Sequence, residues 1–219
     1  MNIYVVVEGE STEKKVYDSW IPLVNPKLRR IDYLPDFTSD NYLIIAGLGY
    51  PYYFNIIENA IEDINSQGNI DRLVIAVDSE EMSYTEKFSE VADFIKDHPC
   101  KADIRIIIQH FCFESWALGN KKIIGRSVQD ITLLKYKRFY NVLSQDPELM
   151  PAYTEGKLNR VLFAYKYLAL AFREKYKHLV YSKRSPNPLL NRNYFEQLRN
   201  RLQETNHIKS FESFINSFL

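Results

Sequence analysis

Cysteine is scarce in this chain of 219 residues, where Cys100 and Cys112 are the only two. Their number and spacing exclude a disulfide framework and a zinc site, so both are expected to be ordinary reduced thiols. The sequence also lacks an apolar run long enough to span a bilayer, and its first residues contain no basic segment and no cleavage site. These absences predict a cytoplasmic protein that does not enter a membrane.

A phosphate loop of the pattern Gly-x-x-x-x-Gly-Lys-Ser/Thr is absent as well, which excludes a P-loop ATPase within these residues. Internal repeats and low-complexity linkers are also missing, which argues against a domain on a flexible tether. The remaining composition, 46% hydrophobic and 26% charged, is ordinary for a globular protein. The length is enough for one α/β core with a smaller appended part.

Charge is unevenly distributed, although the formal net charge is zero. Residues 1–118 contain 10 Lys and Arg against 20 Asp and Glu, a balance of −10, whereas residues 119–219 contain 18 against 8, a balance of +10. An acidic half that can hold cations and a basic half that can hold a polyanion suit an enzyme acting on nucleic acid. Alternatively, the two halves attract each other, or the basic half binds an acidic partner.

The first half alternates strand and helix patterns at the rhythm of a mostly parallel sheet. Continuous β-branched runs predict strands covered on both faces, and apolar residues three or four apart predict helices between them. The predicted strands are 3–7, 31–34, 42–46, 72–77 and 104–108, and the predicted helices are 12–23, 54–64 and 88–95.

Helical patterns dominate after Gly119, and the predicted helices are 135–143, 157–176, 194–203 and 211–218. The sequence therefore predicts an α/β protein with a Rossmann-like central sheet flanked by helices. Residues 1–118 are expected to form the catalytic domain, and residues 119–219 a basic, mainly helical extension packed on it.

Acidic side chains follow two of the predicted strands. The strand at 3–7 runs into residues 8–13 (EGESTE), and the strand at 72–77 runs into residues 78–81 (DSEE). Because parallel strands end at the same edge of a sheet, where α/β proteins build their sites, these carboxylates are expected to gather there. Oxygen ligands of this kind hold Mg²⁺ or Mn²⁺ while leaving room for water and phosphate.

Each acidic segment also has a purely structural interpretation. Ser11 or Thr12 can cap the helix that follows, and Glu13 suits its dipole. That interpretation explains Glu13 but does not explain Glu8 at the end of a hydrophobic strand. Likewise, a solvated loop explains Glu81 but not Asp78.

These segments together resemble the Toprim domain, which occurs in topoisomerases, primases and the nucleases of the OLD and RloB-like groups. The resemblance rests on a strand that runs into Val-Glu-Gly-x-Ser/Thr-x-Glu, here residues 7–13, and on a second strand ending in Asp-x-Glu, here residues 78–80. Residues 109–118 (QHFCFESWAL) are similar to the Pro-Cys-Phe-Glu-x-Trp-Leu-Leu pattern of RloB-like proteins. The resemblance covers residues 1–118 well and the remainder loosely.

The resemblance implies that Glu8, Asp78 and Glu80 cluster around Mg²⁺, with Glu13 and Glu114 as ligands of a second ion. Two departures from the family pattern bear on this set. Glu80 stands where many members have aspartate, a longer arm that shifts one metal position. His110 stands near a place where RloB-like sequences often carry Asn-Pro, and it is a ligand, a proton carrier or a plain structural histidine.

Several basic residues of the second half are candidates for contact with phosphate. Tyr181 and Lys183 correspond to a Tyr-x-Lys pattern of RloB-like proteins, which implies that Lys183 stabilises the extra negative charge of the transition state. A solvated loop is the alternative. The residues predicted to bind nucleic acid are Lys121, Lys122, Arg126, Lys183 and Arg184.

The sequence thus predicts a nuclease that hydrolyses phosphodiester bonds of DNA or RNA, tRNA included, with Mg²⁺ or Mn²⁺ as cofactor. Glu8, Asp78, Glu80 and Lys183 are its predicted catalytic residues. The resemblance further implies a phage-defence effector controlled by a separate ABC-type ATPase subunit, and it is compatible with a homo-oligomer.

The alternative is a non-catalytic Toprim-fold subunit that binds nucleic acid or regulates a partner. Nucleotidyl transfer, as in primases, fits less well because the chain is short and has no template-binding or zinc module. A topoisomerase is disfavoured because no tyrosine lies in a separate nicking domain.

Overall fold

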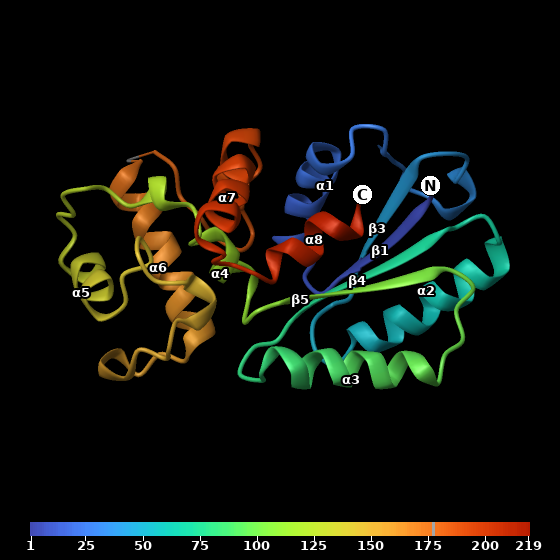
Figure 1. The fold of residues 1–219 in the computed structure, drawn as a ribbon, viewed down its shortest axis with the longest axis horizontal. Coiled ribbons are helices and arrows are strands. Elements are labelled where there is room, and N and C mark those ends of the chain that lie inside the picture. Colours follow the sequence, from blue (N-terminus) through green and yellow to red (C-terminus); the bar gives the residue numbers. More distant parts are fainter. Residues whose placement is uncertain (177) are drawn as a thin grey trace. The chain divides into compact units, whose positions relative to one another are not determined.

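A computed structural model describes residues 1–176 and 178–219 (Figure 1). The strands are β1 (Ile3–Val7), β2 (Arg29–Arg30), β3 (Asn41–Ala46), β4 (Arg72–Asp78) and β5 (Asp103–Gln109). The α-helices are α1 (Glu13–Val24), α2 (Tyr53–Gln67), α3 (Tyr84–Lys96), α4 (Phe113–Ala117), α5 (Ile131–Phe139), α6 (Arg160–Lys175), α7 (Arg192–Thr205) and α8 (Phe211–Ser217). Short 3-10 helices are η1 (Leu34–Asp36), η2 (Lys121–Ile123), η3 (Pro147–Leu149), η4 (Thr154–Gly156) and η5 (Asn187–Leu189).

The strands form one parallel sheet in the order β2-β3-β1-β4-β5. β1 lies in the middle, with Val5 opposite Ile44 of β3 on one side and Val74 of β4 on the other. All residues of β1 are buried, as expected for a strand with neighbours on both sides and helices on both faces. The predicted α/β class with a Rossmann-like sheet is confirmed.

Helices cover both faces of this sheet, α2 and α3 on one and α1 and α8 on the other (Figure 1). On the first face, Ile57 of α2 and Val91 of α3 belong to the same buried cluster as Val6. On the second, Tyr17 of α1 meets Phe214 of α8 edge to face, with ring centroids 4.8 Å apart. The alternation of side chains along each strand supplies both layers of the core.

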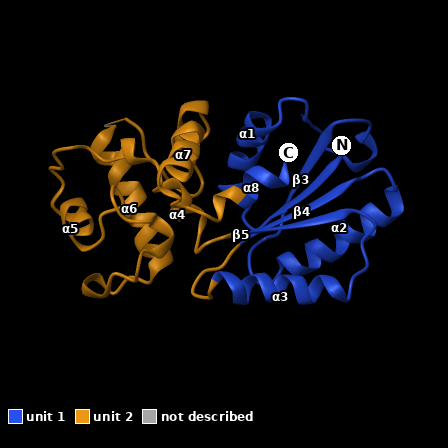
Figure 2. Ribbon diagram, in the orientation of Figure 1, with its two compact units in different colours: residues 1–77, 84–108, 213–219 blue, residues 78–83, 109–212 orange. Residues whose placement is uncertain are grey.

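The chain divides into two compact units (Figure 2). Unit 1 consists of residues 1–77, 84–108 and 213–219, and unit 2 consists of residues 78–83 and 109–212. These limits differ from the expected boundary after residue 118, because the loop after β4 belongs to unit 2 and the C-terminal segment belongs to unit 1. Arg72 Nη1 donates to the carbonyl of Ser217 at 2.8 Å, which ties that segment to β4.

Three local expectations are wrong. Residues 31–34 form no strand: β2 covers only two residues at the sheet edge, and Pro35, which lacks an N–H, sits inside η1. Thr12 precedes α1 but makes no side-chain capping hydrogen bond, so of the two expected caps only Ser11 stays a prediction. The helix expected at 135–143 begins earlier, at Ile131, because Asp130 caps it by accepting the N–H groups of Thr132 and Leu133.

Unit 2 has a core of its own, which is rich in aromatic rings. Tyr136 of α5 packs against Phe163 and Tyr167 of α6, with centroids 4.9 and 5.8 Å apart. The region after residue 119 is mainly helical, as expected. In the part of the chain that the structure describes, no helix combines the length and the apolar character needed to cross a membrane.

Candidate functional site

At the end of β1, the main chain of Glu8 is held by two other segments of unit 1. Its N–H donates to the carbonyl of Ala76 in β4 at 2.9 Å, and its carbonyl accepts from the N–H of Gly49 at 3.1 Å. The residue itself is half-buried. Glu8 therefore stands, as the sequence indicates, directly after a buried strand at the centre of the sheet.

Glu13, the first residue of α1, is only 8% exposed. Its carboxylate lies over the turn that follows β1, because a Cβ at position 9 would stand 2.1 Å from Glu13 Oε2. Because glycine has no Cβ, it is the one residue type at position 9 that lets the Glu13 carboxylate keep this position. The acid is thus directed back toward the end of β1, rather than outward as for a simple helix-dipole residue.

The loop that follows β4 is fixed by main-chain hydrogen bonds inside unit 2. The N–H of Ser79 donates to the carbonyl of Gln109 at 3.2 Å, and the N–H of Glu80 donates to that of Phe111 at 2.7 Å. Glu80 has a φ of +50°, in the left-handed region that non-glycine residues rarely adopt. Such a conformation persists only where the surroundings enforce it. Asp78 is half-buried and Glu80 is exposed.

Arg160, at the start of α6, enforces this loop conformation. Its Nε and Nη2 both donate to the carbonyl of Glu80, at 2.9 and 2.5 Å, and Nη2 also donates to the carbonyl of Met82 at 2.8 Å. The guanidinium carbon lies 4.7 Å from the ring centroid of Phe111. One planar side chain therefore joins the loop after β4 to the segment after β5.

Glu114 of α4 is almost completely buried, at 1% exposure. Its Oε1 accepts a hydrogen bond from the hydroxyl of Tyr181 at 2.9 Å and lies 4.0 Å from Lys183 Nζ. Its Oε2 is buried and meets no hydrogen-bond donor among the described residues. A buried carboxylate oxygen without a donor is costly, and a bound cation is one of the arrangements that removes the cost.

The thiol of Cys112 relates Glu114 to the acid at the end of β4. Burial raises its pKa well above the usual value, and the negative charges of Glu114 and Asp78 raise that pKa further, while the positive charge of Lys183 opposes them. The charges of both carboxylates and of the ammonium thus act on the same buried thiol. Both cysteines are free, as expected, and the thiol of Cys112 stays protonated.

Asp78 and Glu114 are two hard oxygen ligands of unit 2 whose charges act on the same thiol. Mg²⁺ is commonly bound through one or two carboxylates and keeps several waters, so this donor set fits it. No group of three or more His, Cys, Asp or Glu side chains within residues 1–176 and 178–219 forms a ready metal site. Glu8 and Glu13 lie in unit 1 and Glu80 is exposed, so the five-carboxylate set stays a prediction.

His110 lies beside the loop after β4, where its Nδ1 shares a hydrogen bond with Ser79 Oγ at 2.8 Å. Burial and the positive charge of Arg160 lower the pKa of His110, and the negative charge of Asp146 opposes them. Ser79 is fully buried, so its hydroxyl is closed to a substrate. The hydrogen bond gives His110 a structural role in holding the loop, while the roles of ligand and proton carrier stay predictions.

The basic residues predicted to bind nucleic acid fall into two groups, both inside unit 2. Lys183 and Arg184 occupy the centre of a tight turn closed by Ser182 and Ser185, whose main chains exchange hydrogen bonds of 3.0 and 3.4 Å. The turn forms part of the wall of a cavity of about 530 Å³. The second group, Lys121, Lys122 and Arg126, lines a separate cavity of about 510 Å³.

No pattern in the sequence distinguishes Arg160, because its partners are main-chain carbonyls that any residue offers. The contact between Tyr181 and Glu114 joins residues 67 apart in the chain, and only a family resemblance drew attention to both. Comparisons of this chain with family models, with curated proteins and with solved structures yield no match.

Proposed function

We propose that this protein is a Toprim-type nuclease that hydrolyses phosphodiester bonds of DNA or RNA with Mg²⁺ or Mn²⁺. The observation that carries the proposal is Glu114, a buried carboxylate with one oxygen that meets no donor among the described residues and the other 4.0 Å from Lys183 Nζ. The charges of Glu114, of Lys183 and of a second carboxylate, Asp78, all act on the thiol of Cys112. Carboxylates provide ligands for a divalent cation, and an ammonium group attracts a phosphate. The combination suits phosphoryl chemistry better than it suits a purely structural ion pair.

Asp78 and Glu114 are the residues that would hold the cation in unit 2, with Glu80 as an exposed third acid. Glu8 and Glu13, the predicted acids of unit 1, lie at the end of β1 and at the start of α1. When bound, the cation supplies Lewis acidity toward a phosphate oxygen. Asp78 and Glu114 would fix its position and balance its charge.

Lys183 has a different role, which is to bind the phosphate that is attacked. Its side chain is 53% exposed and lies at the centre of a turn, so that the ammonium is open to a substrate. Positive charge at this place stabilises the additional negative charge that develops on phosphorus-bound oxygens. Arg160 acts indirectly, because it fixes the loop that carries Asp78 and Glu80 and is itself occupied by main-chain carbonyls.

Cleavage of supercoiled plasmid, single-stranded DNA and total tRNA by the purified protein, with Mg²⁺, Mn²⁺ or EDTA, tests the proposal. Metal-dependent cleavage by the native protein is expected, with its loss in a Glu8→Ala/Asp78→Ala variant. A matched control removes two exposed acids of unit 1, Asp36→Ala/Glu62→Ala, and is expected to cleave normally. Unchanged cleavage by the Glu8/Asp78 variant would refute the catalytic assignment.

Thermal unfolding gives a second readout that does not depend on finding the substrate. Because a cation that binds only the folded state stabilises it, Mg²⁺ or Mn²⁺ is expected to raise the Tm of the native protein. The increase is expected to disappear in Glu114→Gln, which retains the shape of the side chain but not its charge. No cleavage and no metal effect on Tm would favour a Toprim-fold subunit that binds nucleic acid without cutting it.

A separate ABC-type ATPase is the partner proposed to control the nuclease, in the setting of phage defence. It follows from the Toprim resemblance and from the absence of a phosphate loop in this sequence. Affinity purification of the tagged protein from cells carrying its neighbouring genes is expected to recover an ATPase that changes the cleavage rate. Full activity of the isolated chain, with no ATPase recovered, would contradict the dependence.

A further inference from the structure

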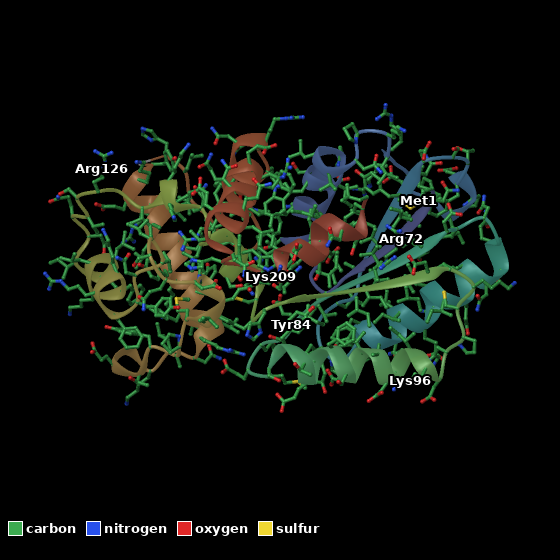
Figure 3. All side chains as sticks on the ribbon, viewed as in Figure 1. Met1, Arg72, Tyr84, Lys96, Arg126 and Lys209 are labelled. Atoms are coloured by element: carbon green, nitrogen blue, oxygen red, sulfur yellow. The ribbon has the colours of Figure 1, made fainter. Side chains whose placement is uncertain are left out.

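A cavity of about 510 Å³ in unit 2 brings together basic side chains from two distant segments. Lys121, Lys122 and Arg126 follow α4, and Lys175 ends α6. No acidic side chain among the described residues pairs with any of the four. Arg126 extends from the surface of unit 2 (Figure 3). Positive charge of this density, which no protein carboxylate neutralises, is complementary to a polyanion.

Part of the lining of the same cavity is apolar and includes an aromatic ring. Ile124 and Leu143 are among the residues that line the cavity, and Tyr176, which also lines it, is 39% exposed. Tyr176 is supported from behind by Phe172, with centroids 6.2 Å apart. A half-exposed ring on a rigid support is a surface on which an unpaired base can stack.

A second cavity, of about 240 Å³, adjoins the first, because Lys122 and Tyr176 line both. Two side-chain amides from α7 reach into it, and Gln197 Nε2 donates to Asn193 Oδ1 at 3.4 Å. This arrangement leaves the side-chain N–H groups of Asn193 and the side-chain carbonyl of Gln197 for a ligand. One donor beside one acceptor is the pattern with which amide side chains read the edge of a base.

We propose that the two adjoining cavities bind a single-stranded nucleic acid. Phosphates contact the four basic side chains, and one unpaired base stacks on Tyr176 with its edge toward Asn193 and Gln197. A duplex cannot use this surface, because its bases are already paired and stacked inside the helix. This inference rests on the proposed nuclease function in one respect, namely that the polyanion is a nucleic acid. It adds that the substrate is single-stranded.

Fluorescence anisotropy in EDTA measures binding without cleavage. Labelled single strands of RNA and DNA are expected to bind the native chain more tightly than a duplex of the same sequence. A Lys121→Gln/Lys122→Gln/Arg126→Gln variant is expected to lower the slope of log affinity against log salt by about 2, since each phosphate contact with a single strand contributes about 0.7. The charge-matched control Lys27→Gln/Lys96→Gln/Lys166→Gln, with all three sites outside the cavities, is expected to keep the native slope.

Stacking is tested separately from charge. Tyr176→Ala is expected to weaken single-strand binding about tenfold, whereas Tyr176→Phe retains the ring and the native affinity. A free mononucleotide that displaces the strand completely at a concentration similar to that of the strand would instead identify a nucleotide pocket. Equal affinity for duplex and single strand, or equal loss in the triple variant and its control, would overturn the proposal.

The outcomes for binding and for cleavage are independent. Single-strand binding in EDTA, without cleavage under any metal condition, would support the proposed binding site and refute the proposed nuclease function. The opposite outcome is metal-dependent cleavage that is unchanged in the triple variant and in Tyr176→Ala, with unchanged anisotropy in both. It would support the proposed nuclease function and refute the proposed binding site.

Discussion

Replacing Arg160 by methionine is expected to loosen the loop after β4 by about 2 kcal/mol. Hydrogen bonds from a charged donor contribute about 1.5–3 kcal/mol each, and Arg160 holds the carbonyls of both Glu80 and Met82. Contact of the guanidinium with the Phe111 ring adds about 0.5–1 kcal/mol at a partly exposed position. The lower ends of these ranges add to about 3.5 kcal/mol. Because the side chain of Arg160 is 19% exposed, water replaces part of the lost hydrogen bonding, which reduces the expected cost to about 2 kcal/mol.

Hydrogen exchange measures this loosening at defined amides. The N–H of Glu80 donates to the carbonyl of Phe111 at 2.7 Å, and the N–H of Met82 to that of Ser79 at 2.9 Å. A loss of about 2 kcal/mol corresponds to exchange about 30-fold faster at these two amides. Metal-dependent cleavage is expected to fall as well, because the same loop carries Asp78.

Two further variants separate the guanidinium fork from general effects on α6. Arg160→Lys keeps the charge but cannot bind two carbonyls at once, so it is expected to resemble Arg160→Met in exchange. Lys166→Met changes an exposed residue of the same helix and is expected to leave exchange in the loop unchanged. Native exchange rates in Arg160→Met would refute the view that this residue enforces the loop.

Three other perturbations follow from buried groups of the two units. Tyr181→Phe removes the donor to Glu114 Oε1 and is expected to lower the free energy of unfolding by about 1–3 kcal/mol in urea titrations. Adding Glu114→Gln to this variant should recover part of the lost stability. A double variant no more stable than Tyr181→Phe would contradict this expectation. Gly9→Ala places a Cβ 2.1 Å from the carboxylate of Glu13, which must then move. Metal-dependent cleavage is therefore expected to fall. Normal cleavage by this variant would show that the position of the Glu13 carboxylate does not matter for activity. Burial raises the pKa of Glu148 to about 7, so the folded state binds more protons than the unfolded state between about pH 4.5 and 7. The free energy of unfolding should therefore decrease by about 3 kcal/mol as the pH rises through this window, and the decrease should be absent in Glu148→Gln; identical pH profiles of the two proteins would exclude Glu148 as its source.

The strands at the centre of the sheet could be predicted from the sequence, because their residues are apolar without interruption. β1 has the predicted limits, and β4 extends one residue further, to Asp78. The edge strand β2 could not be predicted, since its two residues are both arginine and carry no strand pattern. A strand at a sheet edge is held by main-chain pairing to one neighbour only, which leaves its side chains free to be polar.

The candidate site was predictable where it depends on strand ends and not where it depends on long-range contacts. The acid Asp78 follows from a strand that runs into a carboxylate. Arg160 stands 80 residues from Glu80, and its bonds to main-chain carbonyls leave no mark on the sequence of the loop. Glu114 was indicated only by the resemblance of residues 109–118 to the RloB-like pattern, and the identity of its donor, Tyr181, depends on how unit 2 folds.

A fragment ending at residue 118 contains all the predicted catalytic and metal-binding acids, yet the contacts predict that it does not fold as the intact chain does. It lacks Phe214, whose ring meets Tyr17 and Trp20 of α1 at 4.8 and 6.0 Å. Burial of a side chain of this size contributes about 1.5–3 kcal/mol, and both partners in α1 are fully buried in the intact chain. It also lacks Arg160, which fixes the loop after β4.

Near-UV circular dichroism and urea titration of residues 1–118, beside the intact chain, test this expectation. The fragment is expected to lose the near-UV signal of its tyrosines and tryptophans and to unfold without a cooperative transition. Addition of a synthetic peptide of residues 209–219 is expected to restore part of the signal, since it supplies Phe214 to α1, but not the metal effect on Tm, which needs the donor and the guanidinium of unit 2. A fragment that unfolds cooperatively and responds to Mg²⁺ as the intact chain does would instead show that the acids are organised by the sheet alone, because no residue of α6 or of the turn at 182–185 is present in it.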